Sequence, residues 1–322
     1  MTAYKCNKAY INFDNHVAVR GEAMNLTNNI NDTALIFEGG GMRASYTAGF
    51  VNTLLEAGIY FDYVAGISAG ASNSINYLTR DTGRAKKSFV DIVLEPEFGG
   101  WFSFIKGEGY FRASYIYEET YHSDAALPLD FKTFQANPAN LRIGAYDVDN
   151  GRMHYFSKDD IRNVQDLARA VRCSSTLPFF MTPASFREKD YLDGGIGGGL
   201  ALDIAKKDGF EKFFVVLTRP RGFRKHPLKY TQLIKFYFRK SPHVAEALLR
   251  AYQIYNQTLE ELEQLESEGK AFLVYPEVMP VTSMETNFQK LKESYRMGYR
   301  QGQRDLPRWQ EFLGISNSMP NT

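Results

Sequence analysis

Two short apolar runs near the start of the sequence are each followed by a glycine-rich turn and then by a helical pattern. The run TALIF (33–37) leads, one residue later, into three consecutive glycines, and DYVAG (62–66) leads into GISAG (66–70). Apolar side chains then recur at helical spacing, up to Gly58 after the first turn and up to Leu78 after the second. This strand–helix–strand–helix order predicts an α/β fold, with a mostly parallel sheet covered by helices on both faces.

Later segments continue the alternation of strands and helices. The stretch 141–156 alternates apolar and polar residues on both sides of Asn150 and Gly151, which predicts a β-hairpin. The stretch 166–180 is expected to begin as a helix that Pro178 breaks. The remaining expected elements are a strand end with a flexible turn at 190–199, buried strands at 212–220 and 271–276, and helices at 245–269 and 287–313.

The change of pattern at Pro220 divides the chain. With 322 residues, of which 44% are apolar, the chain can bury a sizeable core. We expect an N-terminal leader at 1–32, an α/β domain at 33–220, and a mainly helical region at 221–322 that packs on the core.

Charge and cysteine content restrict the class of protein. Lysine and arginine number 38 against 37 acidic residues, so net charge gives no argument for a nucleic-acid partner. Cys6 and Cys173 lie far apart and form neither a disulfide framework nor a metal site. The N-terminus has no long apolar stretch, and no window of about eighteen residues is apolar and uncharged. We therefore expect a cytoplasmic protein.

The motif GISAG has the form G-x-S-x-G between an expected strand and an expected helix. Gly66 and Gly70 allow a sharp turn that lifts Ser68 above the sheet and leaves its hydroxyl open. The start of the helix behind it favours developing negative charge. Small residues also suit an ordinary tight turn, but the position of this motif favours a nucleophile.

A serine nucleophile needs a base. None of the four histidines that follow Ser68 lies in a loop that is built to hold it, whereas YLDGG places Asp193 at a strand end before two glycines. These glycines would let the carboxylate approach another loop closely. The alternative is an Asp-Gly turn whose carboxylate caps backbone N–H groups.

The three glycines after the first strand allow two functions. Gly39, Gly41 and Ala44 fit the dinucleotide fingerprint G-x-G-x-x-G/A, which belongs to nucleotide-binding oxidoreductases. That class also requires an acidic residue that closes the second strand. Here the second strand ends in GISAG, and Asp62 precedes it. The glycines are better explained as an oxyanion hole, whose N–H groups face a transient negative charge.

Together, GGGMR (39–43), GISAG (66–70) and DGG (193–195) resemble the motifs of the patatin-like phospholipase family. The resemblance implies a lipid acyl hydrolase that needs no metal or organic cofactor, with Ser68 as nucleophile and Asp193 as general base. The other residues that it implies are Gly39, Gly40, Gly41 and Met42 as oxyanion-hole donors, Arg43 as a brace of that loop, Gly66 and Gly70 beside the nucleophile, and Gly194 and Gly195 after the aspartate.

The resemblance covers about residues 33–220, and it is strongest to a bacterial cytosolic branch that carries an additional helical C-terminal region. One position departs from the family pattern G-G-x-x-[RK]-G, because Ala44 replaces the last glycine. If that position required a positive φ, Ala44 would carry strain of about 1 kcal/mol or more. A non-catalytic member of the fold, acting in storage or as a scaffold, stays an alternative.

The stretch 219–240 contains eight Lys or Arg residues, no acidic residue and several aromatics. This composition is typical of a segment that contacts an anionic membrane surface. The alternative is a solvated basic face whose aromatics belong to the core. No nucleic-acid-binding motif accompanies the charge.

The stretch 98–111 places aromatic residues between glycines. It is interpreted either as an apolar flap over an acyl chain or as a small core under a loop.

Overall fold

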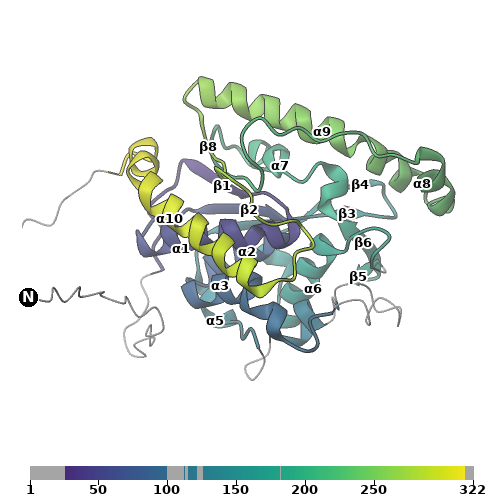
Figure 1. Cartoon of the computed structure of the whole chain (residues 1–322), viewed down its shortest axis with the longest axis horizontal. Coiled ribbons are helices and arrows are strands. Elements are labelled where there is room, and N and C mark those ends of the chain that lie inside the picture. The colour runs from purple at the N-terminus through teal and green to yellow at the C-terminus, as the bar shows by residue number, and fades with distance from the viewer. Residues whose placement is uncertain (1–25, 100–111, 113–114, 122–125, 182, 316–322) are drawn as a thin grey trace, which may run out of the picture.

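The computed structural model describes residues 26–99, 112, 115–121, 126–181 and 183–315. Residues 1–25 of the expected leader, with Cys6, and most of the stretch 98–111 lie outside the described residues. Figure 1 shows one central sheet with helices on both sides.

The sheet contains eight strands in the order β5-β6-β3-β2-β1-β7-β8, and β4 pairs with β3 beside this path. The pairings from β3 through β2, β1 and β7 to β8 are all parallel, whereas β4, β5 and β6 enter antiparallel pairs. The strands are β1 (Thr33–Phe37), β2 (Tyr63–Ile67), β3 (Asn140–Asp147), β4 (Arg152–Phe156), β5 (Ala184–Phe186), β6 (Lys189–Asp193), β7 (Lys212–Val216) and β8 (Ala271–Val274).

Nine α-helices surround the sheet within the described ranges. They are α1 (Ala44–Glu56), α2 (Ala69–Leu78), α3 (Thr82–Phe89), α5 (Phe131–Ala136), α6 (Val164–Ser175), α7 (Leu202–Lys207), α8 (Thr231–Tyr237), α9 (Pro242–Ser267) and α10 (Phe288–Phe312). None of these helices is long and apolar enough to cross a bilayer.

Both faces of the central strands are buried, as a parallel sheet between helices requires. In β1 all five residues are buried, with Leu35 and Phe37 in the core under α1, α2 and α10. Ala34 and Ile36 point to the opposite face, where Leu259 and other residues of α7 and α9 cover the sheet. Figure 1 shows these two helix layers on opposite sides of the strands. The predicted α/β class with helices on both faces is confirmed.

The C-terminal segment also takes part in the sheet. β8 pairs in parallel with β7, so the segment after residue 221 contributes a strand as well as helices. The hairpin predicted around Asn150 and Gly151 is present as β3 and β4. The short helices α7 and α8 were not expected, because six or seven residues give too few turns for a clear periodic pattern.

Candidate active site

The register of three strands brings Ser68 and Asp193 together. β2 runs beside β3 as far as Ile67, which lies opposite Gly144. β6 pairs with the same edge of β3, starting one residue further along β3, where Ala145 lies opposite Asp193. β4 occupies the other side of β3 at this level. The ends of β2 and β6 therefore meet, although they are far apart in the sequence.

Ser68 occupies a strained turn between β2 and α2, with φ 56° and ψ −126°. A positive φ is unfavourable for a residue with a side chain, and it marks the sharp elbow that G-x-S-x-G predicts. The hydroxyl does not cap α2. Instead, Ser68 Oγ donates a hydrogen bond of 2.6 Å to Asp193 Oδ2. The backbone N–H of Ser68 donates to Ser174 Oγ at 2.8 Å, which ties the elbow to α6.

The two glycines of the elbow are required by close backbone contacts. A Cβ atom on Gly66 would lie 2.4 Å from the carbonyl oxygen of Gly70. A Cβ atom on Gly70 would lie 2.2 Å from the carbonyl oxygen of Phe37, at the end of β1. Any side chain at either position would therefore displace the turn that carries Ser68.

Asp193 is only 4% exposed, and its two carboxylate oxygens have separate partners. Oδ2 accepts the hydrogen bond from Ser68, while Oδ1 accepts one from the backbone N–H of Gly195 at 2.6 Å. The same carboxylate therefore both caps the Asp-Gly turn and contacts Ser68. Gly194 permits this approach, since a Cβ atom there would lie 2.6 Å from the carbonyl oxygen of Gly144.

Burial raises the pKa of Asp193 above its ordinary value. The hydrogen bonds from Ser68 and Gly195 and the positive charge of Lys225 act in the opposite direction, because each favours the ionised form. The carboxylate is thus a stronger base than an exposed aspartate.

The raised pKa of Asp193 predicts how the free energy of unfolding depends on pH. A carboxyl group whose pKa is raised by folding stabilises the protein below the unfolded pKa, and this contribution is lost as the pH rises through the folded pKa. At pH 7 the ionised Asp193 should therefore destabilise the fold. Asp193→Asn keeps an acceptor for Gly195, and we expect it to raise the free energy of unfolding at pH 7 by about 1 kcal/mol.

Thermal unfolding of both proteins checks this expectation. The advantage of Asp193→Asn should shrink as the pH falls toward about 4, the ordinary aspartate pKa, because Asp193 in the folded wild-type protein takes up its proton above that value. A variant that melts at or below the wild-type temperature at pH 7 would contradict a raised pKa.

The loop after β1 presents two N–H groups near Ser68 that have no acceptor among the described residues. They belong to Gly40 and Gly41, and Gly41 has the left-handed φ of 56° that favours glycine. The N–H of Met42 already donates to the carbonyl of Ser283 at 3.0 Å, and that of Gly39 lies 3.4 Å from the carbonyl of Gly199. Of the four expected oxyanion-hole donors, Gly40 and Gly41 are therefore the two whose N–H groups have no acceptor in the described part of the chain.

Arg43 and Ala44 follow in the same loop. The backbone N–H of Arg43 donates to the Gly40 carbonyl at 3.3 Å, but its guanidinium has no hydrogen-bond acceptor within the described part of the chain. Burial, and then the charge of Arg219, lowers the pKa of Arg43 to about 10. Ala44 has φ −65°, in the right-handed helical region, so its replacement of glycine introduces no backbone strain.

A cavity of about 270 Å³ opens over the Ser68–Asp193 pair. The glycines of the loop and Ser68 lie at one part of its wall. Apolar side chains supply much of the rest, and they are Met42, Phe89, Phe98, Ile116, Leu127, Leu177 and Met181. The space is therefore suited to a small polar reacting group joined to an apolar chain.

Several residues at this site were not expected from the sequence. Glu38 is 4% exposed and accepts a hydrogen bond from the backbone N–H of Thr218. Ser174 supports the elbow, and Ser283 holds the glycine loop through its carbonyl. A carboxylate directly after a buried strand was a visible signal for Glu38. The other two act across long sequence separations that leave no local pattern.

The histidines of the described residues do not contact the pair. His154 packs its ring against Phe156 and Tyr191, and burial lowers its pKa. The ring of His243 contacts the carbonyl of Val148, beside the hairpin turn. Neither of these residues lies among those that line the cavity, and nor does His226, the third histidine of the described residues.

Comparison with curated proteins finds relatives of low sequence identity. The chain is 24% identical over 272 residues to the uncharacterized protein YjjU of Escherichia coli K12, covering 82% of this chain and 74% of that one. It is 26% identical over 216 residues to the uncharacterized protein YqhO of Bacillus subtilis 168, covering 60% and 73%. It is also 25% identical over 292 residues to "Lysophospholipase nte1" of Aspergillus terreus, covering 84% of this chain but 18% of that protein.

Comparison with solved structures finds VipD of Legionella pneumophila, with a TM-score of 0.48 and 15% identity over 86% of this chain and 67% of that one. A model named as a domain of unknown function, DUF6363, matches residues 241–314, which include the whole of α9 and α10. The model named as patatin-like phospholipase matches residues 35–206, more than half of the chain, and this range holds the end of β1, the serine elbow and Asp193. The chain belongs to the patatin-like phospholipase family.

Proposed function

We propose that this protein is a serine acyl hydrolase that cleaves carboxyl esters of lipids, with Ser68 as nucleophile and Asp193 as general base. The hydrogen bond of 2.6 Å between Ser68 Oγ and Asp193 Oδ2, under a largely apolar cavity, carries the proposal. Membership of the family and the name of the Aspergillus terreus relative both support a lipid ester as the substrate.

The proposed reaction begins when Ser68 Oγ attacks the ester carbonyl carbon and Asp193 accepts the hydroxyl proton. The oxyanion lies against the N–H groups of Gly40 and Gly41, and removal of one such donor typically costs about 2.7–4 kcal/mol. The alcohol leaves with the proton from Asp193, and an acyl-serine remains. Asp193 then takes a proton from water, which attacks the acyl-serine. As the fatty acid leaves, Asp193 returns this proton to Ser68 Oγ.

Hydrolysis of a lysophospholipid by the purified full chain tests the proposal. Release of fatty acid should be measured across pH, because Asp193 must be ionised to act as a base. The raised pKa of this carboxyl places the acid limb of kcat/KM above about 3.9, the ordinary aspartate value. A folded protein that releases no fatty acid from lysophospholipid, phospholipid or simple acyl esters would overturn the proposal.

We also propose that α8 and the residues beside it contact an anionic membrane. We call this part of the protein, residues 230–240, the α8 surface. Tyr230, Leu233, Phe236 and Tyr237 are 58–78% exposed, so the interpretation that these side chains belong to the core does not hold for them. Figure 1 shows α8 at one end of α9, at the edge of the molecule.

The α8 surface adjoins the cavity. The ring of Phe179 contacts those of Tyr237 and Phe238, with centroids 4.9 and 5.2 Å apart. Phe179 lies between Leu177 and Met181, which both line the cavity. A bilayer held at the α8 surface would therefore place lipid near the cavity wall.

Vesicle sedimentation tests this contact. Lys235 and Lys240 of the α8 surface take part in no ion pair between described residues. Each cation near an anionic bilayer contributes about 1 kcal/mol, so Lys235→Gln with Lys240→Gln should weaken binding to phosphatidylglycerol vesicles by about 30-fold.

The matched control is Arg296→Gln with Arg300→Gln, which removes the same charge from α10 and should not change binding. Binding should also fall with added salt. Equal binding to phosphatidylcholine and phosphatidylglycerol vesicles, or equal loss in both double variants, would contradict membrane contact at α8.

A further inference from the structure

The segment that follows β7, residues 218–225, carries four basic residues. Two of them line the cavity and are called inward, and the other two do not line it and are called outward. Arg219 and Lys225 line the cavity together with Ser68 and Asp193. Arg221 and Arg224 are not among the lining residues. All four lie after residue 206, where the match to the patatin-like phospholipase model ends. The segment therefore adds positive charge to the cavity, and this charge comes from residues outside the range that the family model matches.

The two outward residues have acidic partners on α9. Arg221 forms two hydrogen bonds with the carboxylate of Glu266, at 2.8 and 2.9 Å. Arg224 forms an ion pair with Glu263, the next acidic position along the same helix face. The positive charges of this pair are thus compensated within the fold.

The two inward residues lack such partners among the described residues. The guanidinium of Arg219 lies 4.4 Å from the centre of the Phe223 ring. Lys225 Nζ donates to the carbonyl of Gly198 at 3.0 Å and lies 4.1 Å from the centre of the Tyr255 ring. Ring faces and one carbonyl orient these cations but do not neutralise them.

The backbone at Lys225 is held in place by α9. The N–H of Lys225 donates to Asn256 Oδ1 at 2.8 Å, and Asn256 Nδ2 donates to the Lys225 carbonyl at 3.0 Å. At the other end of the segment, Thr218 Oγ1 donates to the carbonyl of Gly39 at 3.0 Å. The inward cations are therefore preorganised next to the glycine loop.

The cavity carries an excess of positive charge. Its described lining contains four cationic residues, Arg43, Arg84, Arg219 and Lys225, against the two carboxylates of Glu38 and Asp193. Glu38 already accepts a hydrogen bond from Thr218. Burial lowers the pKa of Lys225, as expected for an ammonium group that has lost water without gaining a full partner.

We propose that Arg219 and Lys225 form a phosphate subsite, which binds the phosphate group of an acyl ester substrate while Ser68 attacks its carbonyl. A planar guanidinium with a neighbouring ammonium is a pairing well suited to phosphate oxygens. The subsite rests on the proposed function and deepens it: the preferred substrates are phosphate-bearing acyl esters rather than neutral ones.

The kinetic test compares two substrates with the same acyl chain, 1-oleoyl-lysophosphatidylglycerol and 1-oleoylglycerol, in the same mixed micelles. A hydrogen bond to a charged group contributes about 1.5–3 kcal/mol, so Arg219→Gln or Lys225→Gln should each lower the ratio of the two kcat/KM values by about tenfold or more. Most of this change should come from a higher KM for the phosphate-bearing substrate.

The matched controls are Arg221→Gln and Arg224→Gln, which remove paired cations from the same segment and should leave the ratio within about twofold of wild type. A ratio that stays constant in Arg219→Gln and Lys225→Gln, with both substrates losing equally, would overturn the subsite. The same holds if the controls lower the ratio as much as the inward variants.

A binding test separates the subsite from the proposed reaction. Ser68→Ala protein is titrated with decyl phosphate, decanol and inorganic phosphate by calorimetry, so that no turnover is needed. Decyl phosphate should bind at least about tenfold more tightly than decanol, and Arg219→Gln should remove this difference. Equal binding of decyl phosphate and decanol would overturn the subsite. Inorganic phosphate that binds as tightly as decyl phosphate would overturn its assignment to the acyl substrate.

Discussion

Ser68→Ala should reduce kcat/KM for lipid ester hydrolysis by about 10⁴-fold or more, because it removes the hydroxyl that forms the proposed acyl intermediate. Asp193→Asn should have an effect of similar size, since an amide hydrogen-bonded to Ser68 Oγ cannot accept its proton. The double variant should be little worse than either single variant, because nucleophile and base act as one unit.

Matched controls distinguish lost chemistry from lost structure. Ser72→Ala removes a hydroxyl one turn later on α2, at a position that also lines the cavity. Asp190→Asn changes an exposed aspartate on β6, three residues before Asp193. Both should stay close to wild-type activity. Fatty-acid release by folded Ser68→Ala at more than about a tenth of the wild-type rate would contradict the assignment.

Gly298→Leu should lower the free energy of unfolding by about 3 kcal/mol or more, because α1 and α10 cross in backbone contact at this point. A Cβ atom on Gly298 would lie 2.0 Å from the carbonyl oxygen of Tyr46, and one on Gly49 would lie 2.3 Å from the N of Tyr299. Gly302, one turn later, would meet Thr53 in the same way. A leucine at 298 must push the two helices apart.

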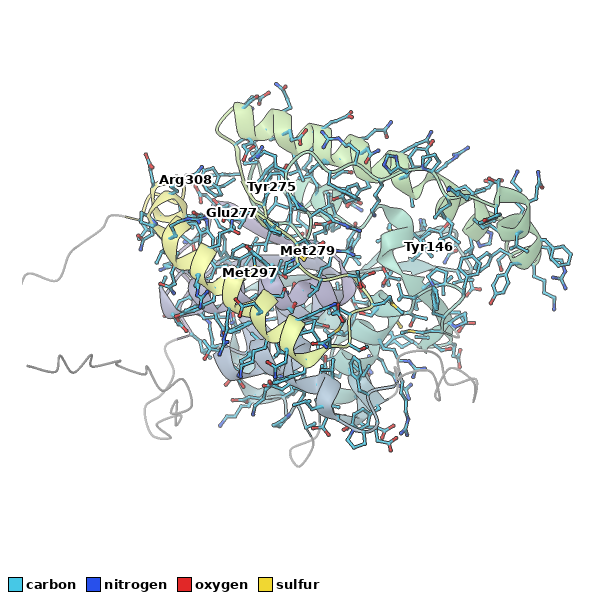
Figure 2. All side chains as sticks on the ribbon, in the orientation of Figure 1. Tyr146, Tyr275, Glu277, Met279, Met297 and Arg308 are labelled. Carbon is cyan, nitrogen blue, oxygen red and sulfur yellow. The ribbon has the colours of Figure 1, made fainter. Side chains whose placement is uncertain are left out.

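Gly298→Leu should also disturb the candidate active site, because it displaces α10. The segment between β8 and α10, on which Figure 2 labels Tyr275, Glu277 and Met279, is anchored to α10 through Gln301. Its residue Ser283 accepts the hydrogen bond from Met42 in the glycine loop. Displacement of α10 should therefore also reduce hydrolysis.

Arg300→Leu is the matched control for Gly298→Leu, since it introduces the same side chain at an exposed position of α10. Urea unfolding of the two variants should differ by most of the expected 3 kcal/mol or so. A Gly298→Leu protein as stable as Arg300→Leu would contradict close packing of α1 on α10.

The sequence was informative where local pattern and chemistry agree. The first two strands, their helices and the β3–β4 hairpin each have a period and a turn signal within about twenty residues. The serine elbow was also visible, because G-x-S-x-G stands between a strand pattern and a helix pattern. Its positive φ at Ser68 is the strain expected of such a turn.

The remaining features depend on contacts between distant segments. Gly298 and Gly302 carry no local signal for the crossing with α1, since glycine in a helix is ordinarily only unfavourable. The bond from Met42 to Ser283 joins residues 241 positions apart, so no local pattern shows that the N–H of Met42 already has an acceptor. The inward and outward cations of the segment after β7 look alike in sequence, because their difference arises from the acidic face of α9.

Reaction with a fluorophosphonate probe shows whether Asp193 activates Ser68 for covalent attack. We expect one adduct per folded chain, mapped to the peptide that contains Ser68. The adduct should be absent from Ser68→Ala and form much more slowly in Asp193→Asn. Equal labelling of Ser68→Ala and wild type, or a folded wild-type protein that forms no adduct, would contradict this activation.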